Sequence, residues 1–301
     1  MSNSKNILYL ISLILLMLTG CEADSSLAPF PNEGKEPVEV RFHAISVGAN
    51  VDVSRAPYEE KGFETDDQIG IWNEFYSNIS LTYNNNPDAE YNLSTTDNST
   101  IYYPFQTNEM TVYAYAPYSD EAYNSNNNTV LVRSEWEEGS DYSHYITDPL
   151  WAKTTDITKD APTANLEFTH QMARLKIKIV PQQGISYEKY KLILTFNCPQ
   201  YGTMSLEDGK IRTVYSLGTD TDAYNYEETY MGTSEMPTEY DHTILPGSGL
   251  KSISVRFTEE KGKNYEYIGT FQTSPSFEKG KVTNMVIYLK KLRDHKDTKV
   301  N

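Results

Sequence analysis

The side chains best suited to catalysis or metal binding are scattered along this chain rather than gathered in motifs. The five histidines are single residues, at positions 43, 144, 170, 242 and 295. None has a second ligand at the i, i+4 or C-x-x-C spacing that zinc sites use. His170 stands among strand-like residues, which favours a packed or hydrogen-bonded structural role over a ligand role. We therefore expect no metal site at the histidines.

One acidic segment, TDTDAYNYEE at residues 219–228, has the side chains of a calcium site without their spacing. It lacks the pattern D-x-[DN]-x-[DN]-G with a distal glutamate, so a solvated acidic loop is the simpler interpretation. The sequence also contains no G-x-S-x-G, P-loop or G-x-G-x-x-G motif. We predict that the protein is not an enzyme and that it uses no cofactor.

Aromatic side chains are a second kind of candidate site. The chain has 24 tyrosines, and Trp136 with Tyr142 and Tyr145 forms a cluster that could stack on sugars. Tyrosine also favours strands and brings a polar end to an apolar body. Core packing in β-structure therefore explains most of these residues, and glycan binding stays the alternative.

Cysteine chemistry is limited to two residues, Cys21 and Cys198. Cys198, in LTFNCPQYG, is typical of an inert residue at a strand end. Cys21 closes the apolar run from Ile7 to Leu18, which follows Lys5 and is too short to span a membrane, since a spanning helix needs about 20 residues. A charged start and an apolar middle are features of a secretory signal. A plain signal peptide with a chance cysteine is one interpretation.

The end of this run supports a second interpretation. The residues Leu18-Thr19-Gly20-Cys21 resemble the lipobox of bacterial lipoproteins. The resemblance implies that residues 1–20 are a signal peptide, that Cys21 becomes the N-terminus, and that Cys21 carries the lipid. Residues 21–37, polar and rich in proline, are then a tether between the membrane and the folded chain.

The charge of the chain excludes one class of partner. The formal net charge is −16, from 26 basic and 42 acidic residues. A phosphate-binding surface needs a basic stripe, so we expect no nucleic acid partner. Such a charge suits a soluble, self-repelling surface outside the cell.

The elements that must position any site are strands. Runs such as VEVRFHA, MTVYAYA and RLKIKIV alternate apolar and polar residues, with turn-rich clusters between them. The alternation predicts an all-β chain of two sandwiches, over residues 38–162 and 163–292, with a charged tail at 293–301. Val38, Val40, Phe42 and Ala44 form the apolar face of the first strand. A slip of one residue would turn the opposite set inward.

Several longer segments, in order, resemble the fimbrillin family, the type V pilins of Bacteroidales. They are FETDDQIGIW, IYYPFQTNEMTVYAYAPYS, DPLWAKTTDIT, LEFTHQMARLKIKIV, HTILPGSGLKSISVRF and SFEKGKVTNMVIYLKK. One departure is that Lys281, Val282 and Thr283 follow Gly280, where family members often have an aromatic residue. The resemblance implies two tandem transthyretin-like β-sandwich domains. It implies a lipoprotein of the outer membrane surface that becomes part of a fimbria.

The resemblance also implies a mode of assembly and a set of partners. In the family a trypsin-like protease cuts after an arginine that follows the first strand, and a strand from another subunit fills the groove. Arg55, in VSRAPYEEK, is the candidate cleavage site here, although an ordinary loop arginine has the same appearance. Arg41 is a poorer candidate because it lies within the alternating strand. The implied partners are other fimbrial subunits, the protease, the outer membrane through the lipid, and a surface receptor or glycan.

Two functions follow from these observations. The chain is an assembling fimbrial subunit, or it is a surface lipoprotein that binds glycans or other ligands without polymerising. The tail RDHKDTKVN has Val300 as its only aliphatic residue, and its charged groups would be costly to bury in an apolar groove. We therefore expect a subunit that accepts a strand and donates one poorly, as a tip or accessory subunit would.

The lipobox generates the first testable prediction. In the variant Cys21→Ala the chain should stay unprocessed or lose its membrane attachment, because no other residue of the run offers a thiol for lipid transfer. Membrane fractionation and metabolic labelling with palmitate measure this. Attachment equal to that of the unchanged protein would contradict the lipoprotein interpretation.

Overall fold

The described part of the chain consists of strands and short connections. The computed structural model describes residues 36–48, 62–86, 91–104, 107–134, 144–180, 187–197, 201–214, 224–231, 239–247, 249–259, 264–270 and 277–288. These ranges contain eighteen strands and no helix. The predicted all-β class is therefore confirmed. Cys21 and Arg55 lie outside the described residues.

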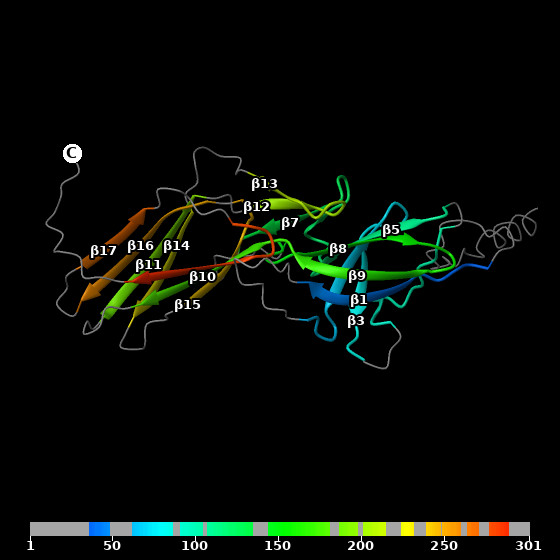
Figure 1. Ribbon diagram of the computed structural model, residues 1–301, viewed down its shortest axis with the longest axis horizontal. Helices are drawn as coiled ribbons and strands as arrows, with labels where there is room; N and C mark the ends of the chain where they lie inside the picture. The colour runs from blue at the N-terminus through cyan, green and yellow to red at the C-terminus, as the bar shows by residue number, and fades with distance from the viewer. Residues whose placement is uncertain are drawn as a thin grey trace, which may run out of the picture.

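Seven strands form a closed barrel at one end of the elongated molecule (Figure 1). Neighbouring strands are antiparallel except at the closing pair, β1 and β9, which run parallel. In spatial order the strands are β1 (Arg41–Gly48), β4 (Leu93–Thr95), β3 (Ile79–Tyr83), β2 (Gln68–Trp72), β5 (Met110–Ala116), β8 (Leu150–Ile157) and β9 (Thr163–His170).

This barrel corrects two expectations. We expected a sandwich of separate sheets over residues 38–162, whereas β1 pairs with strands on both sides and joins the layers into one closed sheet. We also expected residue 163 to begin the second sandwich, whereas β9, which starts there, pairs with β1 and β8. The barrel thus extends to His170, past the expected boundary.

The barrel interior is filled by the apolar faces of its strands. On β9 the side chains of Ala164, Leu166 and Phe168 are fully buried, while those between them are exposed. The same alternation buries Ile69 and Ile71 on β2. Each large side chain buried in this way stabilises the fold by about 1.5–3 kcal/mol, so the alternating pattern determines which face turns inward.

A second sheet is built from both halves of the sequence. Its order is β13-β12-β7-β6, and β7 pairs with β12 over five register positions. It lies between the barrel and the remaining sheets in Figure 1. The strands are β6 (Tyr123–Asn124), β7 (Thr129–Arg133), β12 (Tyr201–Ser205) and β13 (Ile211–Val214).

Tyr115 connects the barrel to a second buried cluster. Alternation predicts that this β5 residue points away from the barrel core, and its side chain is nevertheless fully buried. It packs in a cluster that includes Val130, Met172 and Met204. Its hydroxyl donates to Asn78 Oδ1 at 2.6 Å, and burial raises the pKa of Tyr115 above its ordinary value, which keeps the phenol protonated. The outer face of β5 is therefore buried at Tyr115, although it is partly exposed at Thr111 and Tyr113.

The last part of the chain forms two further sheets at the other end of the molecule (Figure 1). One has the order β15-β10-β18, and the other has the order β14-β11-β16-β17. The strands of the first are β10 (Ala173–Val180), β15 (Glu239–Ile244) and β18 (Val282–Tyr288). Those of the second are β11 (Tyr187–Asn197), β14 (Tyr224–Met231), β16 (Gly249–Glu259) and β17 (Asn264–Thr270).

The two ends of the molecule share one topological feature. In the barrel the first strand, β1, pairs in parallel with the last, β9. In the three-stranded sheet β10 likewise pairs in parallel with β18, the last of the described strands. On β10 the predicted apolar face is confirmed at Leu175 and Ile177, which are buried.

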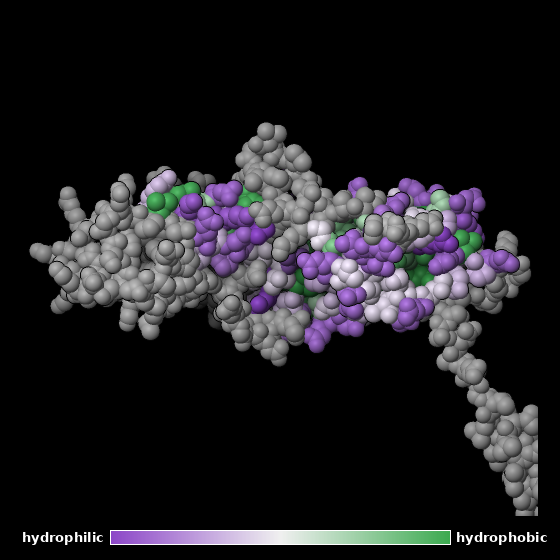
Figure 2. Space-filling model, turned by 90° about the horizontal axis from the view of Figure 1, so that it is seen from below, coloured by the Kyte–Doolittle hydropathy of each residue, from purple (hydrophilic) through white to green (hydrophobic). Residues whose placement is uncertain are grey.

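The described surface is mainly polar. Among the residues coloured in Figure 2 most are hydrophilic, and the hydrophobic ones form small, separate patches. Among the described residues the large hydrophobic side chains that are exposed are Val286 and Tyr288, both on β18. This surface agrees with the strong negative charge of the chain.

The contact between Gly70 and Tyr115 generates the second prediction. A Cβ atom at Gly70 would lie 2.2 Å from Cε1 of Tyr115, whose fully buried ring has no room to move. Gly70→Ala should therefore lower the free energy of unfolding by about 1–3 kcal/mol, the usual cost of overpacking. Urea denaturation measures this.

Gly62 provides the matched control. A Cβ atom built there meets nothing within 4 Å, so Gly62→Ala should change stability by less than about 0.5 kcal/mol. If the two substitutions changed the unfolding free energy equally, the ring of Tyr115 would not lie against Gly70.

Candidate functional site: strand β1 and its seam

Strand β1 is held unequally by its two neighbours in the barrel. Against β9 it forms a parallel ladder that runs from Arg41↔Thr163 to Gly48↔Thr169, with one irregularity between Ala44 and Ser46. Against β4 it has a single register pair, Phe42↔Leu93. The contact between β1 and β4, called the seam below, is therefore the weaker of the two.

The inward face of β1 is the one predicted from the alternation. Val40, Phe42 and Ala44 are only 3%, 4% and 6% exposed and belong to the barrel core, with Val38 partly buried against it. Glu39 and Arg41 are exposed. The register slipped by one residue is excluded for this structure, because it would bury these two charged groups.

Backbone hydrogen bonds secure the chain just before β1. The Val40 N–H donates to Ile101 O at 2.8 Å, and the Tyr103 N–H donates to Val38 O at 2.7 Å. On the other side the Arg41 N–H donates to Pro162 O at 2.9 Å. The start of β1 is thus anchored on both sides, and the asymmetry appears only further along the strand.

Beyond Phe42 a side chain takes the place of a strand neighbour at the seam. The Ala44 N–H donates to Oδ1 of Asn92 at 2.8 Å, and Nδ2 of Asn92 donates to Ala44 O at 2.9 Å. A carboxamide offers the same donor and acceptor as a peptide group, so Asn92 satisfies both polar groups of Ala44 where β4 does not reach. Sequence reasoning missed this residue, because an asparagine beside a strand is typical of a turn.

The outer face of β1 contains the ion pair of Arg41 and Glu39. Arg41 Nε lies 3.9 Å from Glu39 Oε2, and Arg41 Nη1 donates to the Tyr91 hydroxyl at 3.2 Å. The guanidinium also lies 4.9 Å from the centre of the Tyr91 ring. Exposed ion pairs contribute little to stability, so these contacts mainly orient Arg41.

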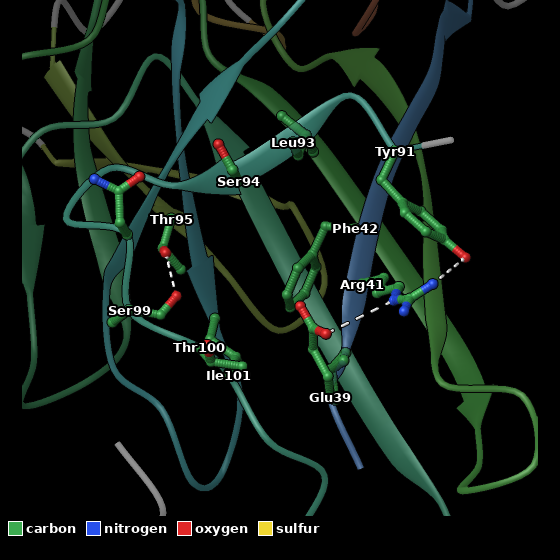
Figure 3. Close-up of a pocket in the computed structure, with 12 residues that line it drawn as sticks. Glu39, Arg41, Phe42, Tyr91, Leu93, Ser94, Thr95, Ser99, Thr100 and Ile101 are labelled. Atoms are coloured by element: carbon green, nitrogen blue, oxygen red, sulfur yellow. Dashed lines mark hydrogen bonds and ion pairs between the residues drawn. The ribbon is translucent and has the colours of Figure 1, made fainter. Parts of the chain in front are cut away.

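A cavity of about 470 Å³ opens along the seam (Figure 3). Residues 39–42, which lead into β1, line one side, and residues of β4 and of the following turn line the other. In Figure 3 Thr95, Ser99 and Thr100 lie at one end of the cavity, and Arg41 with Tyr91 lies at the other. The cavity therefore exists only while β1 occupies its place in the barrel.

The other candidate residues do not assemble into a reactive site. His170 Nδ1 lies 3.1 Å from Asp148 Oδ1, which is the hydrogen-bonded structural role expected for it. Tyr145 packs on Tyr201 with ring centres 5.1 Å apart, while Trp136 and Tyr142 lie outside the described residues. In the described ranges no group of three His, Cys, Asp or Glu side chains is placed to hold a metal ion. Among the same residues, no helix has the length and apolar character needed to cross a membrane.

Residues 54–301 match the family model described as fimbrillin-like, a range that begins after β1. The chain belongs to this fimbrillin-like family. It is a fimbrillin-like protein and not an enzyme.

Solved structures agree with this assignment at the level of the fold. A candidate cell adhesion protein from Bacteroides uniformis is 20% identical with a TM-score of 0.56, over 84% of this chain and 94% of that one. A second, from Bacteroides ovatus, is 16% identical with a TM-score of 0.52, over 84% and 92%. No protein of curated function matches the sequence significantly.

Asn92 generates the third prediction. In Asn92→Leu the Ala44 N–H and C=O lose both partners, and the unfolding free energy should fall by about 1–3 kcal/mol, the cost of leaving a buried polar group unpaired. Hydrogen exchange at the Ala44 amide should become faster. Unchanged exchange would show that Asn92 does not hold the strand.

Asn92→Asp tests the same contact through pH. The ionised carboxylate still accepts from the Ala44 N–H but repels the Ala44 carbonyl oxygen, so only the neutral form can make both bonds. The pKa of the introduced group is therefore raised in the folded state above its ordinary value of about 3.9. Its stabilising contribution is fully present below that ordinary value and is lost as the pH rises through the raised pKa. The difference in unfolding free energy between this variant and the unchanged protein should therefore be larger at pH 7 than at pH 3.5. An equal difference at the two pH values would contradict this.

Proposed function

We propose that this protein is a structural or adhesive subunit of a cell-surface fimbria, assembled by strand exchange after proteolytic removal of β1. The observation that supports this best is the uneven hold on β1, with a ladder to β9 and a single register pair to β4. If β1 separates from β4 and then from β9, the pairs among the other six strands of the barrel stay intact.

The place that β1 occupies has the form of an acceptor groove. Its removal would leave the β9 edge with unpaired N–H and C=O groups and would uncover the core sites of Val40, Phe42 and Ala44. An incoming strand with alternating apolar residues would satisfy both the edge and the core, as in other cases of β-augmentation. The opened protein should therefore be less stable until a donor strand arrives.

Arg55 is the proposed cleavage site. It follows the end of β1 at Gly48 and precedes the next described residue, Gly62. A cut there would separate β1 from β2 and from all the later described strands. Arg41 suits this role poorly, because its backbone N–H is bonded to Pro162 and its residue pairs with Thr163 within the ladder.

The remaining finer parts of the proposal concern anchoring, the fold of each half, and the position in the fibre. We propose that the lipid on Cys21 holds the chain at the outer membrane before assembly. We also propose that each half is a transthyretin-like unit, whose two layers are joined by β1 in the first half. The parallel pairing of β18 with β10 supports a tip or accessory position, because the last alternating run already completes a sheet of its own chain. It is then not available as a donor strand.

A second candidate function is a surface protein that binds glycans or other ligands without polymerising. The cavity along the seam favours it. The two functions differ in whether β1 ever leaves the barrel.

The proposed removal of β1 generates the fourth prediction, which limited proteolysis tests. A trypsin-like protease should produce a new N-terminus at Ala56, and the fragment freed of β1 should melt at a lower temperature. A peptide of residues 38–48 should restore the melting temperature by refilling the groove. Arg55→Ala should abolish the cut, whereas Arg41→Ala should leave it unchanged. A cut protein with unchanged melting temperature and no affinity for the peptide would overturn strand removal.

A further inference from the structure

We propose that the cavity at the seam binds a neutral carbohydrate unit, and that bound sugar retains β1 in the barrel. The inference deepens the second candidate function by giving it a site and a ligand class. Its effect on β1 rests on the proposed role of β1 as a strand that leaves.

The size of the cavity suits a small ligand. Its volume of about 470 Å³ lies within the range of roughly 300–1,000 Å³ that small-molecule sites occupy. Buried apolar side chains contribute to its lining, among them Phe42, Leu93 and Ile101. Such groups can contact the C–H face of a sugar ring.

The polar part of the lining consists mainly of hydroxyl and amide groups. Ser94 and Thr100 supply hydroxyls and Asn98 supplies an amide, while the Thr95 hydroxyl is bonded to the Ser99 carbonyl and the Ser99 hydroxyl is buried. A hydroxyl both donates and accepts, and an amide offers one group of each kind, which matches the mixed character of sugar hydroxyls. A ligand with one apolar face and several hydroxyls fits this combination better than a purely apolar one.

The charges of the lining favour a neutral ligand. The charged lining residues are Arg41 and Glu39, which lie against each other at 3.9 Å and cancel in net charge. A phosphate or carboxylate group would have to compete with Glu39 for Arg41. The chain as a whole carries a formal charge of −16, which also disfavours anions.

The hydroxyl-bearing wall is held in place by its own turn. Thr95 Oγ1 donates to the Ser99 carbonyl, and the Asn98 N–H donates to Thr95 O at 3.1 Å. Asn98 has φ of 59°, a left-handed conformation that asparagine tolerates well. The Ser99 N–H donates to Asp97 Oδ1 at 2.9 Å, and its hydrogen bonds with Ser99 lower the pKa of Asp97. The turn therefore presents its side chains without needing to order on binding.

The position of the cavity couples binding to the fate of β1. Residues 39–42 form one wall, so a ligand that touches both walls binds the closed barrel and not the barrel without β1. By linkage, a ligand at ten times its dissociation constant lowers the ratio of open to closed barrel about 11-fold. A sugar would thus slow the release of β1.

Titration of the ¹⁵N-labelled full chain with lactose, maltose and cellobiose, followed by NMR, tests the binding. We expect amide shifts confined to residues 39–42 and 91–101. Thr100→Val, which replaces a lining hydroxyl by a methyl group, should weaken binding about three- to tenfold. Thr82→Val is the matched control, because Thr82 bonds to Thr96 outside the lining, and it should leave binding unchanged.

The outcomes separate this inference from the proposed function. No shift at these residues with any of the three sugars would overturn the site, and a response to glucuronic acid alone would overturn its neutral character. Hydrogen exchange of β1 amides in the uncut protein tests the coupling without depending on Arg55. Exchange slowed by a saturating sugar supports it, and unchanged exchange overturns the coupling while leaving strand removal by proteolysis a separate question.

Discussion

The closure of the barrel depends on β1, the strand that β9 holds with a full ladder and β4 with one register pair. Buried backbone groups need partners, and at Ala44 the partner is the carboxamide of Asn92 rather than another strand. Where β4 and β1 separate, the space between them becomes the cavity lined by residues 39–42. The short contact between β1 and β4 therefore accounts for three features. They are the weak pairing on this side of β1, the hydrogen bonds from Asn92 in place of a strand, and the cavity.

The alternating patterns predict the strands and their inward faces well, because the side-chain period of a strand is two wherever it runs. Val40, Phe42 and Ala44 are buried as that period requires, and so are Leu175 and Ile177. The fimbrillin-like family was also predictable, since its segments recur in order along most of the chain. These features depend on residues close together in the sequence.

Features that depend on distant residues were not predictable. The polar groups of Ala44 need Asn92, 48 residues away, and no local pattern marks that asparagine. Tyr115 looked like an outward residue because nothing nearby reveals the cluster that covers it. The expected boundary at residue 162 was wrong for the same reason, because the loop there resembles a linker while β9 pairs with β1, a strand far earlier in the sequence. Arg55 and Cys21 lie outside the described residues, so their roles rest on sequence alone.

The parallel pairing of β1 with β9 also has a consequence for the order in which the protein can fold. A chain that emerges N-terminus first exposes Arg41 long before Thr163, its partner in the ladder, 122 positions later. Contacts of such long range form late, because the intervening loop must close first. The apolar residues of β1 are thus made well before β9, the strand that covers them. While the chain folds, a chaperone or a strand of a neighbouring chain could cover these residues of β1 until β9 is available.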